Sequence, residues 1–311
     1  MFLTQTQEWT RRGAALMAEM QAHFDHRGLR ADAMGLVVFE RGASGQAEGF
    51  AWRGDWPCYP CSLVKAFHLV HGLSMVERAQ IAMHADLDRA LRDMILWSSN
   101  TATNYVIDLV TGTTGDTLLS GQAFDEWRTA RERLNGFFTD LGWAEFAGCN
   151  LSQKLMDDTR YGREAQYAGA DGAYLNVLTP LSVARLMWEL FEGDVPLSGP
   201  YLERARGELS RVSTHPEAKN SAYQLTEFLG GGLPDGTELW SKAGHNLWTG
   251  ALESSYFKHD MLRWVRPDGR PIYVVLMTKG QALAETDPQV FPDIGQLLYA
   301  RLNMAEPVEA L

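Results

Sequence analysis

The chain has 311 residues but little cysteine, no long apolar run and no basic cluster. Cys58, Cys61 and Cys149 form an odd and sparse set, which argues against a framework of disulfide bonds. No stretch approaches the roughly 18 apolar residues that a membrane span requires. The net charge is -11, so the protein would repel the phosphates of a nucleic acid. We therefore expect neither a membrane nor a nucleic acid as a partner.

A resident metal ion or cofactor is also not expected. Cys58 and Cys61 have the spacing of a metal-binding or redox pair, but no second pair or nearby histidine completes a zinc site. We interpret both as small apolar residues that line a turn. His68 and His71 lie three residues apart, and no third ligand accompanies them.

The N-terminal residues contain no basic segment followed by an apolar one, so no secretory signal is visible. We expect a cytoplasmic protein, or a periplasmic one if a leader has been trimmed. The composition, with 45% hydrophobic and 22% charged residues, is typical of a soluble globular enzyme. The length allows one or two domains.

Apolar periodicity divides the chain into three parts. The first predicts a helix over 5–25 and strands over 35–40 and 48–52. The second predicts five helices. One begins at Ser62, one covers 87–95 after a cap at Asp86, and one follows Asn100. The other two cover 130–141 and 180–191, the last with a start at Thr179-Pro180. The third predicts strands over 239–243, 247–257 and 271–278 and a closing helix over 294–302.

This order predicts an α+β fold: a five-stranded antiparallel sheet flanked by the terminal helices, with an all-α domain inserted between its strands. We assign residues 1–60 and 205–311 to the sheet domain and residues 61–204 to the inserted helical domain. Residues 150–176 are polar and form a long predicted loop. Loops of this length in a compact domain are often functional.

The first candidate motif is Ser62-Leu-Val-Lys65, at the start of a predicted helix. Backbone N–H groups in a first helical turn have no intrahelical partner, and the positive end of the helix dipole lies there. Lys65 is one turn from Ser62 on the same face, and its apolar surroundings would lower its pKa so that it could act as a base. The alternative is a helix start whose Lys65 extends to solvent.

The second motif is Ser98-Ser99-Asn100, between two predicted helices. The Ser98 hydroxyl could carry a proton between an amine and a leaving group. The Asn100 side chain could hold a substrate amide, since it both donates and accepts hydrogen bonds. Asn100 could equally cap the helix that follows it.

The third motif, Lys242-Ala243-Gly244, ends a predicted strand. Lys242 can supply positive charge, and Gly244 lets the backbone approach a ligand closely. The next residue, His245, could present its backbone N–H to an oxyanion beside that of Ser62. Trp248 is the aromatic residue that we expect to form a wall of the pocket.

Together the ordered motifs resemble the S-x-x-K, S-D-N and K-T-G set of penicillin-recognising serine hydrolases, in particular class A β-lactamases. Residues 91–104, 232–244 and 266–278 resemble wider stretches of that family. The resemblance implies a β-lactamase-like fold and an acyl-enzyme route. Its implied catalytic residues are Ser62 as nucleophile, Lys65 as base and Ser98 as proton relay; its substrate-binding groups are Asn100, Lys242, Gly244 and the His245 backbone.

The chain departs from the family pattern at three places. Ser99 stands where an acidic residue is usual, and Ala243 stands where a hydroxyl usually helps to bind a carboxylate. The family also places a water-activating Glu in a Glu-x-x-x-Asn pattern within the polar loop. Glu164 is the nearest candidate, although no Asn lies four residues on; Asp157 and Asp158 are alternatives, and each could instead be a solvated carboxylate.

We therefore expect a serine hydrolase that cleaves an amide, lactam or ester bond of a small molecule. The altered third motif favours a substrate other than a cell-wall antibiotic. Three alternatives stay open: a true class A β-lactamase, a penicillin-binding-like protein that is acylated without fast turnover, and an inactive fold that serves only interaction.

Overall fold

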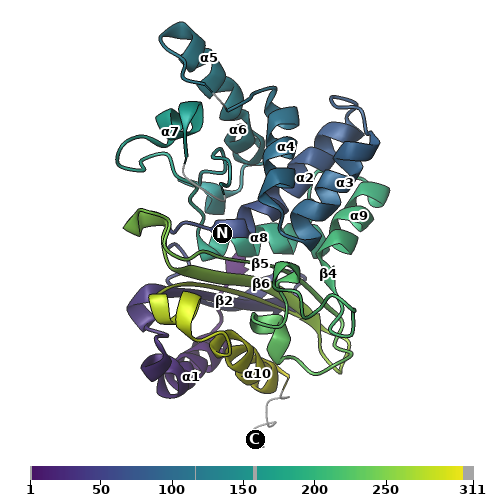
Figure 1. Cartoon of the computed structure of the whole chain (residues 1–311). Helices are drawn as coiled ribbons and strands as arrows, with labels where there is room; N and C mark the ends of the chain where they lie inside the picture. Colours follow the sequence, from purple (N-terminus) through teal and green to yellow (C-terminus); the bar gives the residue numbers. More distant parts are fainter. Residues whose placement is uncertain (1, 116, 157–159, 304–311) are drawn as a thin grey trace, which may run out of the picture.

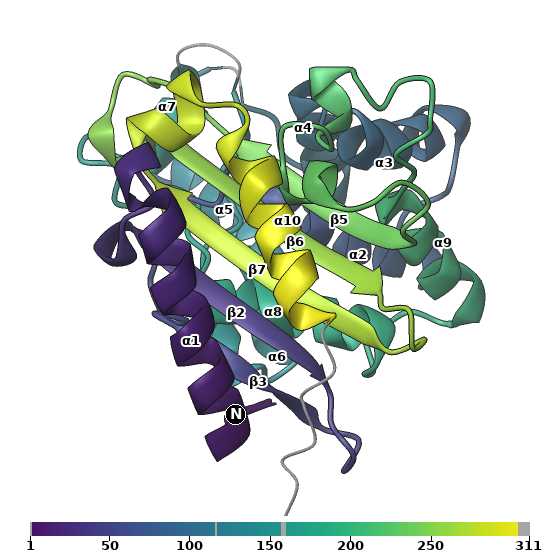
Figure 2. The same ribbon diagram turned by 90° about the horizontal axis from the view of Figure 1, so that it is seen from below.

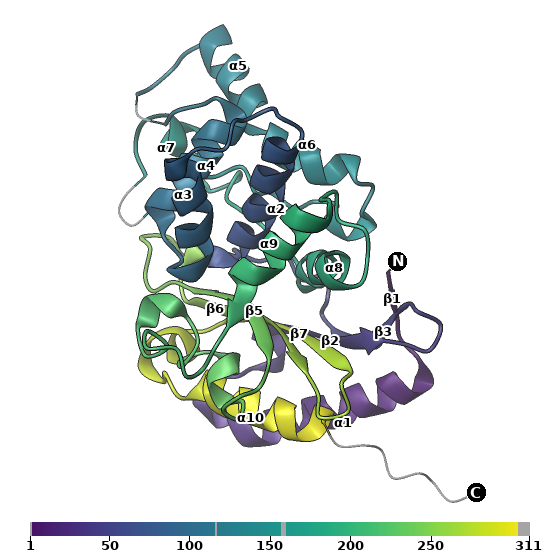
Figure 3. The same cartoon turned by 90° about the vertical axis from the view of Figure 1, so that its right-hand side faces the viewer.

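The computed structural model describes residues 2–115, 117–156 and 160–303. One β-sheet lies between two layers of helices (Figure 1). The terminal helices α1 (Gln7–Phe24) and α10 (Val290–Leu302) cover one face of this sheet, as Figure 2 shows from below. The other helices gather on the opposite face (Figure 3). The predicted α+β fold is confirmed.

The strand order in the sheet is β1-β3-β2-β7-β6-β5-β4. Neighbouring strands are antiparallel except for β1, which pairs in parallel with β3. The sheet thus has seven strands instead of the expected five, because β1 and β4 contain two residues each and are too short to leave a periodic pattern. The strands are β1 (Leu3–Thr4), β2 (Met34–Arg41), β3 (Ala47–Trp52), β4 (Ser210–Arg211), β5 (Leu239–His245), β6 (Phe257–Val265) and β7 (Pro271–Lys279).

Both faces of the sheet are buried, so its central strands read as continuous apolar runs. In β2, Val37 and Phe39 join the core under the larger helical layer, whereas Leu36 and Val38 join the core under α1 and α10. This alternation follows from the two-residue period of a strand. The sheet therefore separates two apolar cores.

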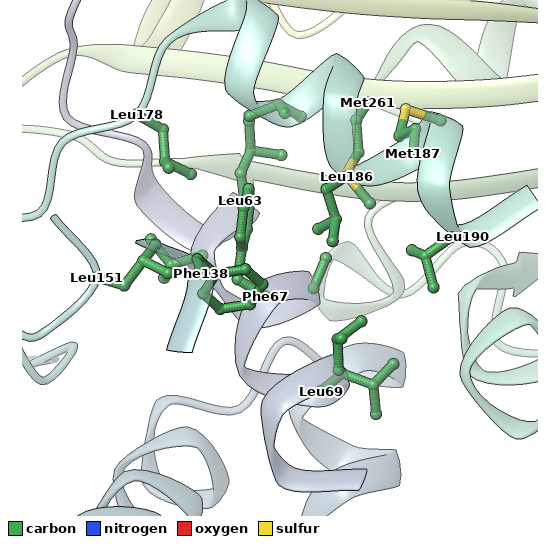
Figure 4. Packing of buried hydrophobic residues seen from close by; sticks show 14 of the residues in the cluster. Leu63, Phe67, Leu69, Phe138, Leu151, Leu178, Leu186, Met187, Leu190 and Met261 are labelled. Carbon is green, nitrogen blue, oxygen red and sulfur yellow. The ribbon is translucent and has the colours of Figure 1, made fainter. Parts of the chain in front are cut away.

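The larger helical layer surrounds α2, a helix that is buried on nearly all sides, as its apolar sequence predicted. Leu63 and Phe67 are fully buried and pack with Phe138, Leu186 and Met261 (Figure 4). The helices of this layer are α2 (Val64–Glu77), α3 (Ala85–Leu96), α4 (Asn100–Thr111), α5 (Gln122–Arg131), α6 (Arg133–Asp140), α7 (Gly162–Ala168), α8 (Pro180–Phe191) and α9 (Gly199–Leu209). None of the helices within the described ranges is long and apolar enough to cross a membrane.

Several local predictions can be compared with these elements. The Thr179 cap is confirmed, because Thr179 and Ser182 form a reciprocal capping box at the start of α8. The Asp86 cap is wrong: the His84 side chain accepts the hydrogen bond from Leu87 N–H instead. Helix α7 lies inside the segment that was predicted as a loop.

The strand predicted over 247–257 is also wrong. Strand β6 begins only at Phe257. Residues 247–253 form a largely exposed loop, and Ser254 and Ser255 after it are buried. Leu247, Trp248 and Leu252 suggested a buried strand, yet their side chains are 45%, 57% and 63% exposed. Gly250 interrupts the segment with φ of 90°, a left-handed conformation that suits glycine.

Candidate active site

Ser62 lies in a short 3-10 turn, Cys61–Leu63, that leads directly into α2. Cys61 has φ of 49°, which is uncommon for a residue with a side chain. Strained backbone of this kind is concentrated at functional sites, where the surrounding structure holds it in place. Ser62 is half-buried and lines a pocket with a volume of about 620 Å³. A pocket of this size suits a small molecule.

Lys65 is completely buried one turn after Ser62. Its Nζ lies 3.1 Å from Ser98 Oγ and 2.7 Å from Asn100 Oδ1, and it also donates to the Ser98 backbone carbonyl. The alternative in which this lysine extends to solvent is wrong. In the described part of the chain, no hydrogen bond joins Lys65 Nζ directly to Ser62 Oγ; the first and second motifs meet through Ser98 and Asn100.

Ser98 brings the second motif into contact with both lysines. Its backbone has φ of 51°, and its Oγ lies 3.1 Å from Lys65 Nζ and 3.0 Å from Lys242 Nζ. Ser99 caps α4 by accepting a hydrogen bond from Ala102 N–H, so the alternative in which Asn100 is the cap is wrong. The Asn100 side chain instead contacts Lys65 and lines the pocket.

Lys242 is completely buried on β5, on the other side of Ser98. Besides Ser98 Oγ, its Nζ donates to the Ala243 carbonyl at 2.6 Å and to the Gln224 side-chain carbonyl. These three acceptors match the three N–H bonds of an ammonium group. Burial, followed by the nearby Lys65, lowers the pKa of Lys242 well below its usual value. Proton exchange at this amine is thereby made easier.

Gly244 allows β5 to lie directly against the turn that carries Ser62. A Cβ at Gly244 would be 2.5 Å from Ser62 N, a distance that real side chains do not tolerate. Asn246 N–H donates to the Phe257 carbonyl at 3.0 Å, so the preceding residue His245 belongs to a non-hydrogen-bonded pair of the ladder. The His245 N–H consequently points away from β6, toward the open edge of β5.

The rest of the pocket comes from three segments that are distant in sequence. Its lining includes Tyr59 and Cys61 before Ser62, then Leu155, Met156 and Arg160 from the polar loop, and residues 245–250, among them Trp248. Asn104 of α4 fixes the polar loop with a hydrogen bond to the Leu155 carbonyl (2.6 Å) and another from Leu155 N–H (3.0 Å). The loop is thus held beside the second motif.

Glu164 does not line this pocket. Glu164 is 3% exposed. One of its carboxylate oxygens lies 2.7 Å from the buried Arg131 guanidinium, and the other accepts a hydrogen bond of 3.0 Å from the same guanidinium. The structure therefore corrects the expected role of Glu164: it forms an internal ion pair that fastens α7 to α5, not a group that faces Ser62. Asp157 and Asp158 lie outside the described residues.

His259 holds the segment before Ser62 from beneath. Its Nε2 donates to the Tyr59 carbonyl at 2.8 Å, because Nδ1 is occupied as the acceptor from Thr278 N–H at 3.1 Å. The ring is completely buried, and burial lowers the pKa of His259 to about 4. Sequence reasoning missed His259, Gln224 and Arg160, since no motif or spacing connects them to Ser62.

The three cysteines are free thiols, and burial raises the pKa of Cys61 well above its usual value. This placement agrees with the interpretation of Cys58 and Cys61 as small apolar residues. Across the described residues, no group of three or more His, Cys, Asp or Glu side chains could hold a metal ion.

Comparison with known proteins identifies a family whose model matches this chain and solved structures with a similar fold. The family model described as the β-lactamase enzyme family matches residues 63–302. A search of curated proteins finds no match.

Three similar solved structures have low sequence identity but nearly complete coverage. The class A β-lactamase of the last common ancestor of Gram-negative bacteria is 20% identical, with a TM-score of 0.61 over 93% of this chain and 99% of that one. A β-lactamase from Burkholderia vietnamiensis is 16% identical, with a TM-score of 0.62 over 94% and 96%. A variant of PBP-A, in an acyl-enzyme complex with penicillin G, is 17% identical, with a TM-score of 0.60 over 93% and 96%.

The family match covers most of the chain, and the shared fold extends from the terminal helices through the helical layer. The protein therefore belongs to the β-lactamase enzyme family.

Proposed function

We propose that this protein is a serine hydrolase that cleaves an amide, lactam or ester bond through an acyl-enzyme on Ser62. The observation that carries the proposal is the position of Ser98 Oγ, within hydrogen-bond distance of both Lys65 and Lys242 beside the Ser62 pocket. A hydroxyl between two amines can pass a proton in either direction. This is the arrangement that acyl transfer needs when nucleophile and leaving group both exchange protons.

In the first step, Ser62 Oγ forms a bond to the substrate carbonyl carbon, and its proton passes to the Lys65 amine. Lys65 must be neutral at that moment. Two of its partners, Ser98 O and Asn100 Oδ1, can only accept hydrogen bonds, whereas Ser98 Oγ can donate one to the amine lone pair. The N–H groups of Ser62 and His245 bind the developing oxyanion.

In the second step, the tetrahedral intermediate loses its leaving group. The carbon–nitrogen or carbon–oxygen bond breaks, Ser98 gives its proton to the departing atom, and the Lys65 ammonium returns a proton to Ser98. When Lys242 is protonated, its charge, 3.0 Å from Ser98 Oγ, favours release of the Ser98 proton. Asn100 and Trp248 orient the substrate, and water completes the cycle by hydrolysing the ester.

A second candidate function is a penicillin-binding-like protein that stays acylated. The observation in its favour is that the described residues lining the pocket include no carboxylate that could activate water, since Glu164 is paired with Arg131. PBP-A shares this fold, and its variant was captured as an acyl-enzyme with penicillin G. A true class A β-lactamase is the third candidate, since it too shares the fold.

Intact mass measured over time, together with turnover assays, separates these functions. The protein is incubated with penicillin G, a chromogenic cephalosporin and a panel of activated amides and esters. An adduct that forms and disappears as product accumulates supports a hydrolase, and the reactive compound identifies its class. An adduct that persists for hours supports the acylated binding protein. Absence of an adduct with every compound would refute both.

A further inference from the structure

His259 lies on β6 directly opposite Gly244 of β5. Directly opposite residues of neighbouring strands have their side chains on the same face of a sheet, and here that face contacts the turn that carries Ser62. At Gly244 the missing side chain leaves space for the turn, since a Cβ there would lie 2.5 Å from Ser62 N. At His259 the ring extends to the same segment, with Nε2 2.8 Å from the Tyr59 carbonyl oxygen. The two opposite residues thus support the turn from the sheet side.

The backbone just before Ser62 needs this support for two reasons. Pro60 has no N–H, so it cannot donate a backbone hydrogen bond. Cys61 has φ of 49°, and strained backbone of this kind persists only where the surrounding structure holds it. The hydrogen bond from His259 fixes the peptide that joins Tyr59 to Pro60, immediately before the strained residue.

The surroundings of His259 determine which ring nitrogen donates. The ring is completely buried, and burial lowers the pKa of His259 to about 4, so the ring is neutral near pH 7. A neutral imidazole has a single N–H. Because Thr278 N–H of β7 donates to Nδ1 at 3.1 Å, that proton is on Nε2 and is directed at the Tyr59 carbonyl. The central strands of the sheet therefore hold the donor in one orientation.

We infer that His259 is a positioning residue, which holds the Tyr59 carbonyl so that the Ser62 N–H points at the carbonyl oxygen of the substrate. This inference rests on the proposed function and adds to it a residue that touches neither the substrate nor the reacting atoms. An oxyanion donor acts only when it is directed at the oxygen on which charge develops. Loss of the His259 bond should thus slow acylation and leave substrate binding nearly unchanged.

Two variants separate the two hydrogen bonds of the ring. His259→Asn can place an oxygen where Nδ1 lies and still accept from Thr278 N–H, but its side chain is too short to reach Tyr59. His259→Gln can place an amide nitrogen where Nε2 lies and still donate to the Tyr59 carbonyl. The nitrophenolate burst from 4-nitrophenyl acetate, measured at several concentrations, gives the acylation rate constant and the dissociation constant of the ester. Intact mass, with Ser62→Ala as the blank, confirms the acylated residue.

His259→Asn should lower the acylation rate constant by about 10- to 100-fold, since a displacement near 1 Å can have an effect of that size. The dissociation constant should change by less than about threefold. His259→Gln should keep the acylation rate constant within about threefold of the wild type, because the donor is restored. His71→Asn is the matched control: it replaces another buried histidine, in α2, and should change neither constant.

A purely structural role predicts a different result, because each His259 variant loses one buried hydrogen bond and both should lose similar stability against urea. Equal acylation rate constants in His259→Asn and His259→Gln would therefore overturn the inference, while acylation of Ser62 in the wild type upholds the function. If His259→Asn does not fold, His259→Gln decides, and a loss of about tenfold or more in that variant would overturn the inference. Failure of activated esters to acylate Ser62 in the wild type would overturn inference and function together.

Discussion

Ser98 is the residue at which the three motifs meet. Its hydroxyl contacts the Lys65 amine from α2 and the Lys242 amine from β5, and its backbone is left-handed, with φ of 51°. The sequence suggested a relay role from the motif alone. It could not indicate that the Lys242 amine is also held by Gln224, because that contact depends on the path of the chain between α9 and β5.

Glu164 was a candidate catalytic residue, but it is buried in an ion pair with Arg131. Replacing Glu164 by Gln would leave the Arg131 guanidinium buried without its counter-charge. Breaking a buried pair in this way costs about 3 to 5 kcal/mol. We therefore predict a loss of that size in the free energy of unfolding, measured with urea, and an unchanged deacylation rate per folded molecule.

Glu126→Gln is the matched control for that variant, because Glu126 is exposed on α5. It should alter the free energy of unfolding by less than about 0.5 kcal/mol. A Glu164→Gln protein with full stability but a long-lived adduct would mean that Glu164 activates water after all.

At the scale of elements, the contact between strand β5 and the turn that carries Ser62 determines the geometry of the proposed oxyanion site. Their approach depends on Gly244, whose absent side chain leaves room for the Ser62 backbone. The two N–H groups proposed to bind the oxyanion belong to these two elements. A small separation of β5 from the turn would thus misplace one donor relative to the other.

Gly244→Ala should therefore reduce acylation of Ser62 by about 100-fold, since a displacement near 1 Å can have an effect of that size. The rate is measured by the nitrophenolate burst. Gly207→Ala is the control: Gly207 lies in α9 with open space around its Cα, so alanine there should leave the rate unchanged and stabilise the helix by up to about 1 kcal/mol. A Gly244→Ala enzyme with the wild-type rate would contradict the proposed oxyanion site.

Much of the secondary structure could be predicted because long elements repeat their apolar residues. The helices around Phe67 and Val183 and the strand around Val37 are examples. The prediction of a strand failed where apolar residues line the pocket and do not join the core. Leu247 and Trp248 gave the apolar pattern of a strand, yet they are exposed and line the pocket. Of the site, the motifs were recognisable, but Arg160 and His259 were not, since their partners are distant in sequence.

At the scale of the whole molecule, three histidines are buried in the fold: His68 and His71 of α2 and His259 of β6. Burial lowers the pKa of His68 to about 3 and those of His71 and His259 to about 4. In the unfolded chain each would titrate near its ordinary value of about 6.5. Between pH 6.5 and 4 the unfolded state therefore binds more protons, so stability is present above pH 6.5 and is lost as the pH falls through 4.

His71→Phe should remove part of this acid sensitivity. The ring of His71 stacks on Phe137 with centroids 4.1 Å apart, and phenylalanine can keep that contact without binding a proton. The difference in the free energy of unfolding between pH 7 and pH 4 should shrink by about 3 kcal/mol. The exposed His26→Gln should leave the difference unchanged. An identical pH dependence in His71→Phe and the wild type would show that His71 does not titrate as described.

The division into a sheet domain of residues 1–60 and 205–311 and a helical domain of residues 61–204 stays a prediction. The apolar core beneath the helical layer contains residues of both parts, including Phe39 and Tyr273 of the sheet and Phe67 of α2. Ser62 lies where these parts meet, so the site depends on the whole fold.

The most direct test of the account is to locate the acyl group. The protein is treated with the ester, amide and lactam panel, digested, and sequenced by tandem mass spectrometry. The account predicts an acyl mass on Ser62, no adduct in Ser62→Ala, and acylation slowed by several orders of magnitude in Lys65→Ala, because nucleophile and base act as a unit. An adduct on any other residue, or undiminished turnover in Ser62→Ala, would contradict it.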